Sequence, residues 1–366
     1  MKNEELIYRL ALTKINGLGP VRQKKLLSLT QDTSDIFKAS KKYLMSAGGI
    51  SANLADMLKK FRDFDEIEKE LIWCQKNKVK ILQFDQDDYP LRLKQCSDGP
   101  AILFYKGQDI LSSPKMISII GTRLYTDYGK RVCEDLIESL KPYQIVVVSG
   151  LAYGIDIIAH KSCIKNQIPT VGVMANGLTQ IYPSVHSSTA RDMLFEGGLM
   201  TEYFSNEKPE KRNFPSRNRI VAGLCDATII IETDVKGGSM ITADIAHAYN
   251  RELFCFPGRS IDVKSSGCNL LIRQMKAQMI TKPEDLVEAL GWSKKKMKKT
   301  AQRNLFVDLN DTEMKVYQLL NEHDHLHLDE ILLRTDFSTT QLATVMLSLE
   351  MQGLIKVLPG KLVSLI

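Results

Sequence analysis

The chain has 366 residues, of which 44% are hydrophobic and 25% charged, and its formal net charge is +6. This length predicts two or three domains. Because the sequence has no apolar run of membrane-spanning length and no signal peptide, it predicts a cytoplasmic protein without membrane contact. Seven cysteines without a C-x-x-C pair argue against a disulfide framework and a zinc site.

The first segment, residues 1–75, has the pattern of short amphipathic helices, and residues 1–80 have a net charge of +6. It contains LTKINGLGPVRQKKLL, in which Gly17 and Gly19 separate two helical stretches. This pattern is typical of a SAM-like or helix-hairpin-helix domain, where a glycine turn exposes backbone N–H groups to phosphates. A plain two-helix turn that needs glycine for a positive φ is the alternative, and the sequence favours neither.

Residues 76–292 alternate between apolar runs and helical stretches. The apolar runs are AILFYKG, MISIIG, IVVVSG, PTVGVM, LMTEY, ATIIIET and ELFCFPG. Helical stretches between them include residues 127–141, 154–166, 239–250 and 268–276. Such runs suit strands buried on both faces of a parallel sheet. The segment is therefore predicted to form a doubly wound, Rossmann-like α/β domain.

The end of the chain combines a basic stretch with an acidic domain. Residues 293–304 include KKKMKKTAQR and are interpreted as a solvated linker, with non-specific DNA contact as the alternative. Residues 305–366 have the outline of a winged helix: three helices and two short strands around Pro359-Gly360. The expected recognition helix, Ser338 to Gln352, contains no Lys or Arg, and residues 305–366 carry a net charge of −5. Because DNA binding needs cations, we predict that this winged helix binds DNA poorly and has a protein-contact or regulatory role instead.

Glycine-rich loops follow four of the predicted strands in the central domain. Among the loop residues are Gly121, Arg123, Gly150, Gly154, Gly177, Gly237, Gly238 and Ser239. Ligands of an open parallel sheet bind beyond the carboxyl ends of its strands, and free N–H groups at helix starts bind anions. The domain has neither G-x-G-x-x-G nor a Walker motif, so NAD and ATP are not supported and we expect no cofactor.

The stretch NFPSRNRIVAGL predicts a helix that begins at Pro215 and Ser216. That start places Arg217 and Arg219 in the first turn, where the helix dipole disfavours cations. Either these arginines pair with carboxylates, or the site receives an anion.

Further cations and an aromatic residue precede these arginines. Lys211 and Arg212 come directly before the stretch, and Phe214 lies within it. Cations beside glycine loops suit the successive phosphates of a nucleic-acid strand, and Phe214 could stack on a base. The alternative is that Phe214 belongs to the core and the arginines form ion pairs within the domain.

These motifs resemble the DNA-processing protein A family of bacteria, called DprA or Smf. The resemblance is carried by IIGTR, VVVSGLAYGIDIIAH, GLTQIYPSVH, NFPSRNRIVAGL, TIIIET, GGSMITADIAHAYNRELFCFPG and SSGCNLLI. It implies an N-terminal SAM-like or helix-hairpin-helix domain, an extended Rossmann domain and, in many members, a C-terminal winged helix. The implied function is not enzymatic: the protein would protect single-stranded DNA taken up in natural transformation and load the recombinase RecA onto it. The family's Rossmann domain forms homodimers.

Matched motif by motif, the resemblance implies a DNA pocket formed by Gly121, Arg123, Gly150, Gly154, Phe214, Arg217, Asn218, Arg219, Gly237, Gly238, Ser239, Thr242 and Asn269. The family commonly has an acidic residue at the position of Thr179, a lysine near Ser184 and an asparagine at His186. A DNA-contacting lysine is therefore missing here. We expect Lys208, Lys211 or Arg212 to replace it.

Two other functions use the same crevice. Distantly similar Rossmann proteins with a GGxGT loop cleave nucleotide N-glycosidic bonds, but the loop from Gly237 to Thr242 has a different spacing, and the expected acid is displaced to Asp244. A SLOG-like sensor of small nucleotides is the second alternative. No acid, base and nucleophile come together in the sequence, so we expect no enzymatic activity.

Overall fold

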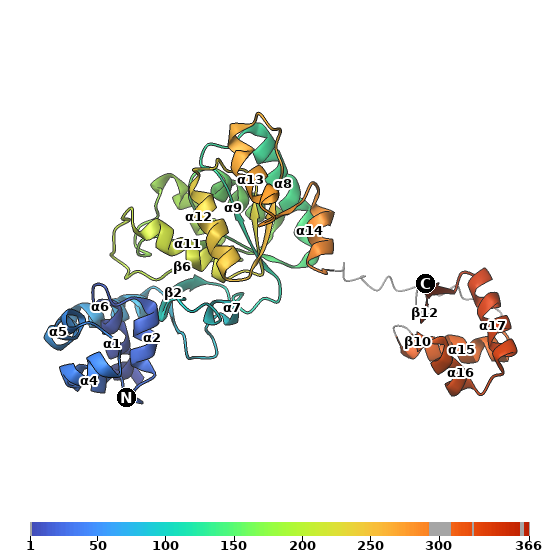
Figure 1. Ribbon diagram of the computed structural model, residues 1–366, viewed down its shortest axis with the longest axis horizontal. Helices are drawn as coiled ribbons and strands as arrows, with labels where there is room; N and C mark the ends of the chain where they lie inside the picture. The colour runs from blue at the N-terminus through green and yellow to red at the C-terminus, as the bar shows by residue number, and fades with distance from the viewer. Residues whose placement is uncertain (1, 293–308, 324–325, 359–361, 366) are drawn as a thin grey trace. The chain divides into compact units, whose positions relative to one another are not determined.

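The computed structural model describes residues 2–292, 309–323, 326–358 and 362–365 (Figure 1). It forms two compact units, residues 1–295 and 296–366. The predicted linker at 293–304 and the turn at Pro359-Gly360 lie outside the described residues. In the described parts, no helix has both the length and the apolar composition needed to cross a bilayer.

Six short helices open the first unit. They are α1 (Lys2–Thr13), α2 (Pro20–Leu27), α3 (Ser34–Lys38), α4 (Lys41–Ser46), α5 (Ala52–Lys60) and α6 (Phe64–Lys76). The chain reverses between α1 and α2 at Gly17, whose φ of +82° suits glycine, and Leu18 is buried behind the turn. Lys24 on α2 donates to the carbonyl oxygens of Cys96 and Ser97, so one cation of this hairpin is used inside the unit.

A nine-stranded sheet forms the centre of the first unit, with the order β1-β2-β6-β5-β4-β3-β7-β8-β9. Its strands are β1 (Lys80–Gln83), β2 (Ile102–Gly107), β3 (Met116–Ile120), β4 (Val146–Ser149), β5 (Thr170–Val173), β6 (Gly198–Thr201), β7 (Ala227–Ile230), β8 (Glu252–Cys255) and β9 (Gln278–Met279). The strands from β6 to β9 in this order are parallel, whereas β1 and β2 pair antiparallel. All seven predicted apolar runs form strands.

Helices cover both faces of the sheet (Figure 1). They are α7 (Leu91–Lys94), α8 (Asp127–Leu140), α9 (Ile155–Asn166), α10 (Ser187–Met193), α11 (Asn213–Gly223), α12 (Gly238–Ala248), α13 (Ser266–Arg273) and α14 (Pro283–Ala289), with 3-10 turns at Lys141–Tyr143, Ser184–His186 and Val263–Ser265. Side chains alternate along β3: Met116 and Ile120 pack with α11 and α12, whereas Ile117 and Ile119 pack with α8 and α9. The predicted doubly wound architecture is confirmed.

The second unit is a winged helix with its own core. It contains α15 (Asp311–Glu322), β10 (Leu326–His327), α16 (Leu328–Thr335), α17 (Thr339–Met351), β11 (Ile355–Leu358) and β12 (Leu362–Leu365). The strands pair in the order β10-β12-β11, so one strand adds to the two predicted. Val316 and Leu349 are buried between the helices, and Ser338 caps α17 in a capping box with Gln341.

Candidate nucleic-acid interface

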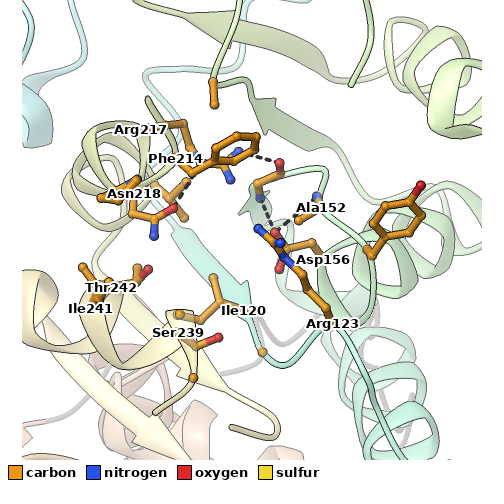
Figure 2. A pocket seen from close by; sticks show the side chains of 18 of the residues that line it. Ile120, Arg123, Ala152, Asp156, Phe214, Arg217, Asn218, Ser239, Ile241 and Thr242 are labelled. Carbon is orange, nitrogen blue, oxygen red and sulfur yellow. Dashed lines mark hydrogen bonds between the residues drawn. The ribbon is translucent and has the colours of Figure 1, made fainter. Parts of the chain in front are cut away.

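A cleft of about 710 Å³ opens at the carboxyl ends of β3, β4 and β5 (Figure 2). In the sheet, β3 lies between β4 and β7, and this is where doubly wound sheets bind their ligands, because the connections diverge to either side. The cleft is lined by eleven of the predicted site residues: Gly121, Arg123, Gly150, Lys211, Phe214, Arg217, Asn218, Gly237, Gly238, Ser239 and Thr242.

Gly154 shapes the cleft without lining it. Its φ is +85°, and a Cβ at this position would lie 2.1 Å from the carbonyl oxygen of Thr122. The N–H of Ile155 donates to the same oxygen at 3.2 Å. This close approach fixes the loop after β3 against the start of α9, and it holds the exposed Arg123 at the edge of the cleft.

The first turn of α12 presents backbone N–H groups to the cleft. Gly237 is its N-cap, and within the described residues no side chain caps this helix start. A Cβ at Gly238 would meet no atom within 4 Å, so the space in front of the turn is open. Ser239 and Thr242 point into the same space (Figure 2). An open helix N-terminus of this kind attracts anions.

Arg217 forms the floor of the cleft and is buried. Its guanidinium donates to two backbone carbonyl oxygens, one of them that of Gly150, and its Nε donates to Asn218 Oδ1 at 3.1 Å. Beside it, the Asp156 carboxylate accepts hydrogen bonds from the backbone N–H groups of Gly150 at 3.1 Å and Ala152 at 3.4 Å (Figure 2). The arginine is thus held by the protein's own acceptors.

Burial and the neighbouring charge shift the pKa values of Asp156 and Arg217 in opposite directions. Burial raises the pKa of the Asp156 carboxyl, and the neighbouring Arg217 counteracts that rise. Burial lowers the pKa of the Arg217 guanidinium, and Asp156 counteracts that fall. Each group therefore stabilises the charged form of the other. A Cβ at Gly150 would lie 2.7 Å from both side chains, so only glycine leaves room for the pair.

Aromatic rings form another part of the lining. Phe214 is half-buried, and its ring centroid lies 5.7 Å from that of Tyr182 in an edge-on arrangement. The Cζ atoms of Arg123 and Arg217 lie 5.9 and 6.0 Å from the Phe214 centroid. Tyr153 is exposed at the same cleft. The lining therefore combines cations, free donors and rings, which are the groups that contact phosphates and unpaired bases.

Helix α11 begins earlier than the sequence predicted. It starts at Asn213, and Ser216 lies inside it and donates to the carbonyl oxygen of Arg212. Pro215 occupies the first turn, where its missing N–H costs no helical hydrogen bond. Arg217 and Arg219 therefore lie in the second turn, and their predicted position in the first turn is wrong.

Two of the predicted cations lie on the opposite side of α11. Arg219 forms an ion pair with Glu202 and donates to the carbonyl oxygen of Asp98. Arg212 forms an ion pair with Glu210 at 2.7 Å. Both line a second cleft of about 580 Å³ between α11 and the turn that joins α1 to α2. For Arg219, the structure thus shows the ion pair that the sequence left as one of two alternatives.

Two further residues hold loops in place. Asn269 exchanges hydrogen bonds with the backbone of Gly258, at 3.1 and 3.0 Å, and does not line the cleft. Asp244, the displaced acid, forms an ion pair with Lys276 at 3.0 Å and also lies away from the lining. Among the described residues that line the cleft, the one carboxylate is the buried Asp156.

The comparisons with known proteins agree with this fold. A family model described as DNA recombination-mediator protein A matches residues 80–291, which is more than half of the chain. The chain belongs to the DNA recombination-mediator protein A family. A second family model, described as the DprA winged helix domain, matches residues 304–361.

Individual relatives of this family cover most of the chain. Protein Smf of Synechocystis sp. is 33% identical over 299 residues, which are 80% of this chain and 74% of that protein. The X-ray structure of DNA processing protein A from Streptococcus pneumoniae has a TM-score of 0.67 at 29% identity, covering 77% of this chain and 97% of that one. A structure of the Helicobacter pylori protein, reported for its single-stranded DNA binding mode, has a TM-score of 0.53 at 31% identity, covering 58% and 95%.

The positions at which this chain departs from the family motif lie beside the cleft. His186 is buried, and its Nδ1 lies 2.8 Å from the carbonyl oxygen of Leu151, so it does not face the lining. Of the lysines expected to replace the missing one, Lys211 lines the cleft. Sequence reasoning missed Tyr153 and Tyr182, although both lie within motifs that carry the resemblance.

Proposed function

We propose that the chain binds single-stranded DNA in the cleft at the carboxyl ends of β3, β4 and β5. The observation that carries this proposal is the open, uncapped first turn of α12 in a cleft with the exposed cations Arg123 and Lys211. Phosphates bind to such groups, and the rings of Phe214 and Tyr182 offer surfaces on which unpaired bases stack. Paired bases of a duplex are stacked on each other and leave those rings unused.

The lining residues divide by chemistry in this proposal. Arg123 and Lys211 contact phosphates, whereas Asn218, Ser239 and Thr242 offer hydrogen-bonding groups to the strand. Small residues let the strand approach the backbone: Gly121, Gly150, Gly237 and Gly238. Of the remaining predicted residues, Gly154, Arg217 and Asn269 hold loops of the domain in place, whereas Arg212 and Arg219 form ion pairs outside the cleft.

Fluorescence anisotropy of a labelled oligonucleotide tests the proposal. We expect the full-length protein to bind a single strand more tightly than a duplex, and binding to weaken linearly on a logarithmic salt scale. An Arg123→Ala, Lys211→Ala double variant should bind more weakly and lose about two charges from the salt slope. Lys161→Ala, an exposed lysine on α9 outside the cleft, is the matched control. A double variant that binds like the control contradicts the proposal.

The wider role proposed here is that of a recombination mediator. The chain would protect single strands that enter the cell in natural transformation and load RecA onto them. Family membership supports this role. The test is the rate at which RecA begins hydrolysing ATP on strands coated with single-strand binding protein. We expect the wild type to raise that rate and the Arg123→Ala, Lys211→Ala variant to raise it less. A rate that the wild type leaves unchanged refutes the mediator role.

We also propose a homodimer through the Rossmann domain, across the edge strand β9. This strand ends the sheet, and the apolar side chains of Met275 and Met279 are exposed on and beside it. An exposed edge with apolar side chains favours pairing with a second copy. Light scattering after size exclusion should give a dimer mass for the wild type and a monomer mass for Met279→Glu. Phe195→Glu, at another exposed apolar position, is the control.

A further inference from the structure

Exposed apolar side chains gather on three loops next to the cleft. The loops are residues 121–126, 231–237 and 256–265, which follow β3, β7 and β8, so all three lie at the carboxyl edge of the sheet. With the first turn of α8 they carry an outer rim, which consists of Leu124, Tyr125, Tyr128, Val235, Ile261 and Val263. Leu124 and Ile261 are 70% and 77% exposed.

Hydrogen bonds hold these loops side by side. Tyr128 Oη donates to the carbonyl oxygen of Pro257 at 2.8 Å, which joins the first loop to the third. The N–H of Gly267 donates to the carbonyl oxygen of Thr233 at 2.8 Å, which joins the second loop to the start of α13, directly after the third loop. Leu124 also lines the cleft. The outer rim is therefore continuous with the cleft.

Single exposed apolar residues are common on protein surfaces, but a group of them on adjacent loops marks an interaction site. Here the group stands among cations: Arg123, Lys130, Lys236, Arg259 and Lys264. Four carboxylates lie near them. The buried Glu232 accepts hydrogen bonds from the backbone N–H and the hydroxyl of Thr126. Asp262 is paired with Arg259, Asp234 accepts from the backbone N–H of Lys236, and Asp127 is exposed. Cations thus outnumber carboxylates, so a polyanion fits this surface better than an acidic protein does.

We propose that the outer rim is a second subsite for the single strand, occupied by nucleotides that have left the cleft. Unpaired bases lie on Tyr125, Ile261 and Val263, and the surrounding cations meet the phosphates between those bases. This inference rests on the proposed function and extends it. The strand-binding surface is longer than the cleft, and affinity depends on a part of the strand that the cleft does not hold.

DNA strands of two lengths distinguish binding in the cleft from binding at the outer rim. Labelled oligothymidylates of about 6 and about 20 nucleotides, within the range of site sizes of single-strand binding folds, are titrated with the full-length protein. The variant is Tyr125→Ser, Ile261→Ser, Val263→Ser, in which no changed residue lines the cleft. Phe195→Ser is the matched control, because this side chain is also 77% exposed but lies between α10 and β6.

We expect the wild type to bind the long strand more tightly than the short one. The triple variant should bind the short strand like the wild type and the long strand at least about fivefold more weakly, the fold-change expected when one stacked base is lost. Equal affinities of variant and wild type for the long strand overturn the outer subsite. So does an equal loss on both lengths, because the rim would then act through the cleft. Unchanged DNA affinity with slower RecA loading assigns the rim to a protein partner and also overturns it. If the wild type binds neither strand, the proposed function itself fails.

Discussion

Replacing Arg217 by alanine should lower the stability of the domain rather than remove a direct contact with DNA. The guanidinium is buried, donates to backbone carbonyl oxygens and lies beside the buried Asp156. Its removal leaves two buried backbone carbonyl oxygens without this donor, at a cost of about 1–3 kcal/mol each, and takes the neighbouring positive charge away from the buried carboxylate. Because single domains are stable by only about 5–15 kcal/mol, this is a large fraction of the total.

Urea denaturation measures the loss. Tryptophan fluorescence reports on the first unit, because Trp292 packs in the core with α8 and α9 and Trp73 packs against the core of the N-terminal helices. We expect the unfolding midpoint of Arg217→Ala to fall sharply, and Asp156→Asn in the same chain to recover part of the loss because no unpaired charge remains. Arg123→Ala, at an exposed position, should change the free energy of unfolding by no more than about 0.5 kcal/mol.

If Arg217→Ala unfolds at the wild-type midpoint and yet binds single strands much more weakly, the arginine contacts the strand directly and is not a floor. If Asp156→Asn recovers nothing, the destabilisation does not come from the unpaired carboxylate.

Other predictions concern single groups. Burial lowers the pKa of His160 to about 3, so between that value and about 6.5 the unfolded chain takes up a proton that the folded chain does not. Stability should therefore fall by about 2 kcal/mol from pH 7 to pH 5, and less in His160→Gln, as read from urea midpoints at both pH values. Gly154→Ala should lower the melting temperature, because its Cβ meets the oxygen of Thr122, whereas Gly238→Ala should keep the wild-type melting temperature and weaken single-strand binding by anisotropy. Removing residues 305–366 should change single-strand affinity by no more than about twofold, because α17 contains no Lys or Arg; a steep loss contradicts that prediction.

The strands could be predicted because the apolar composition of the runs indicates that they are buried. Runs such as MISII and VVVS are apolar except for one serine each, and both serines are buried and donate hydrogen bonds inside the sheet, Ser118 to Thr228 and Ser149 to the carbonyl oxygen of Ile119. A strand covered on both faces is the structure that suits such runs. The loops at the carboxyl edge could also be predicted, because glycine residues follow these runs and because the carboxyl ends of parallel strands lie at the same edge of a sheet. By contrast, the antiparallel pairing of β2 with β6 depends on contacts between distant segments, which periodicity does not encode.

The environment of each arginine could not be predicted for the same reason. Arg217 and Arg219 are two positions apart on one helix, but their partners come from distant parts of the chain: Gly150 for the first and Glu202 for the second. The sequence around these positions shows only that two arginines lie near the start of a helix. Which of them is buried, and on which side of the helix it lies, depends on how α11 packs between two clefts.

Helix α11 also limits how freely this chain can be recombined with its relatives. One side forms the floor of the cleft, and the other meets the 96–98 loop, which Lys24 of the N-terminal helices holds through two carbonyl oxygens. The N-terminal helices are therefore not a detachable module. A chimera that exchanges residues 1–75 without a cation at position 24 takes a donor from the carbonyl oxygens of Cys96 and Ser97, which directly precede Asp98, whose carbonyl oxygen accepts from Arg219.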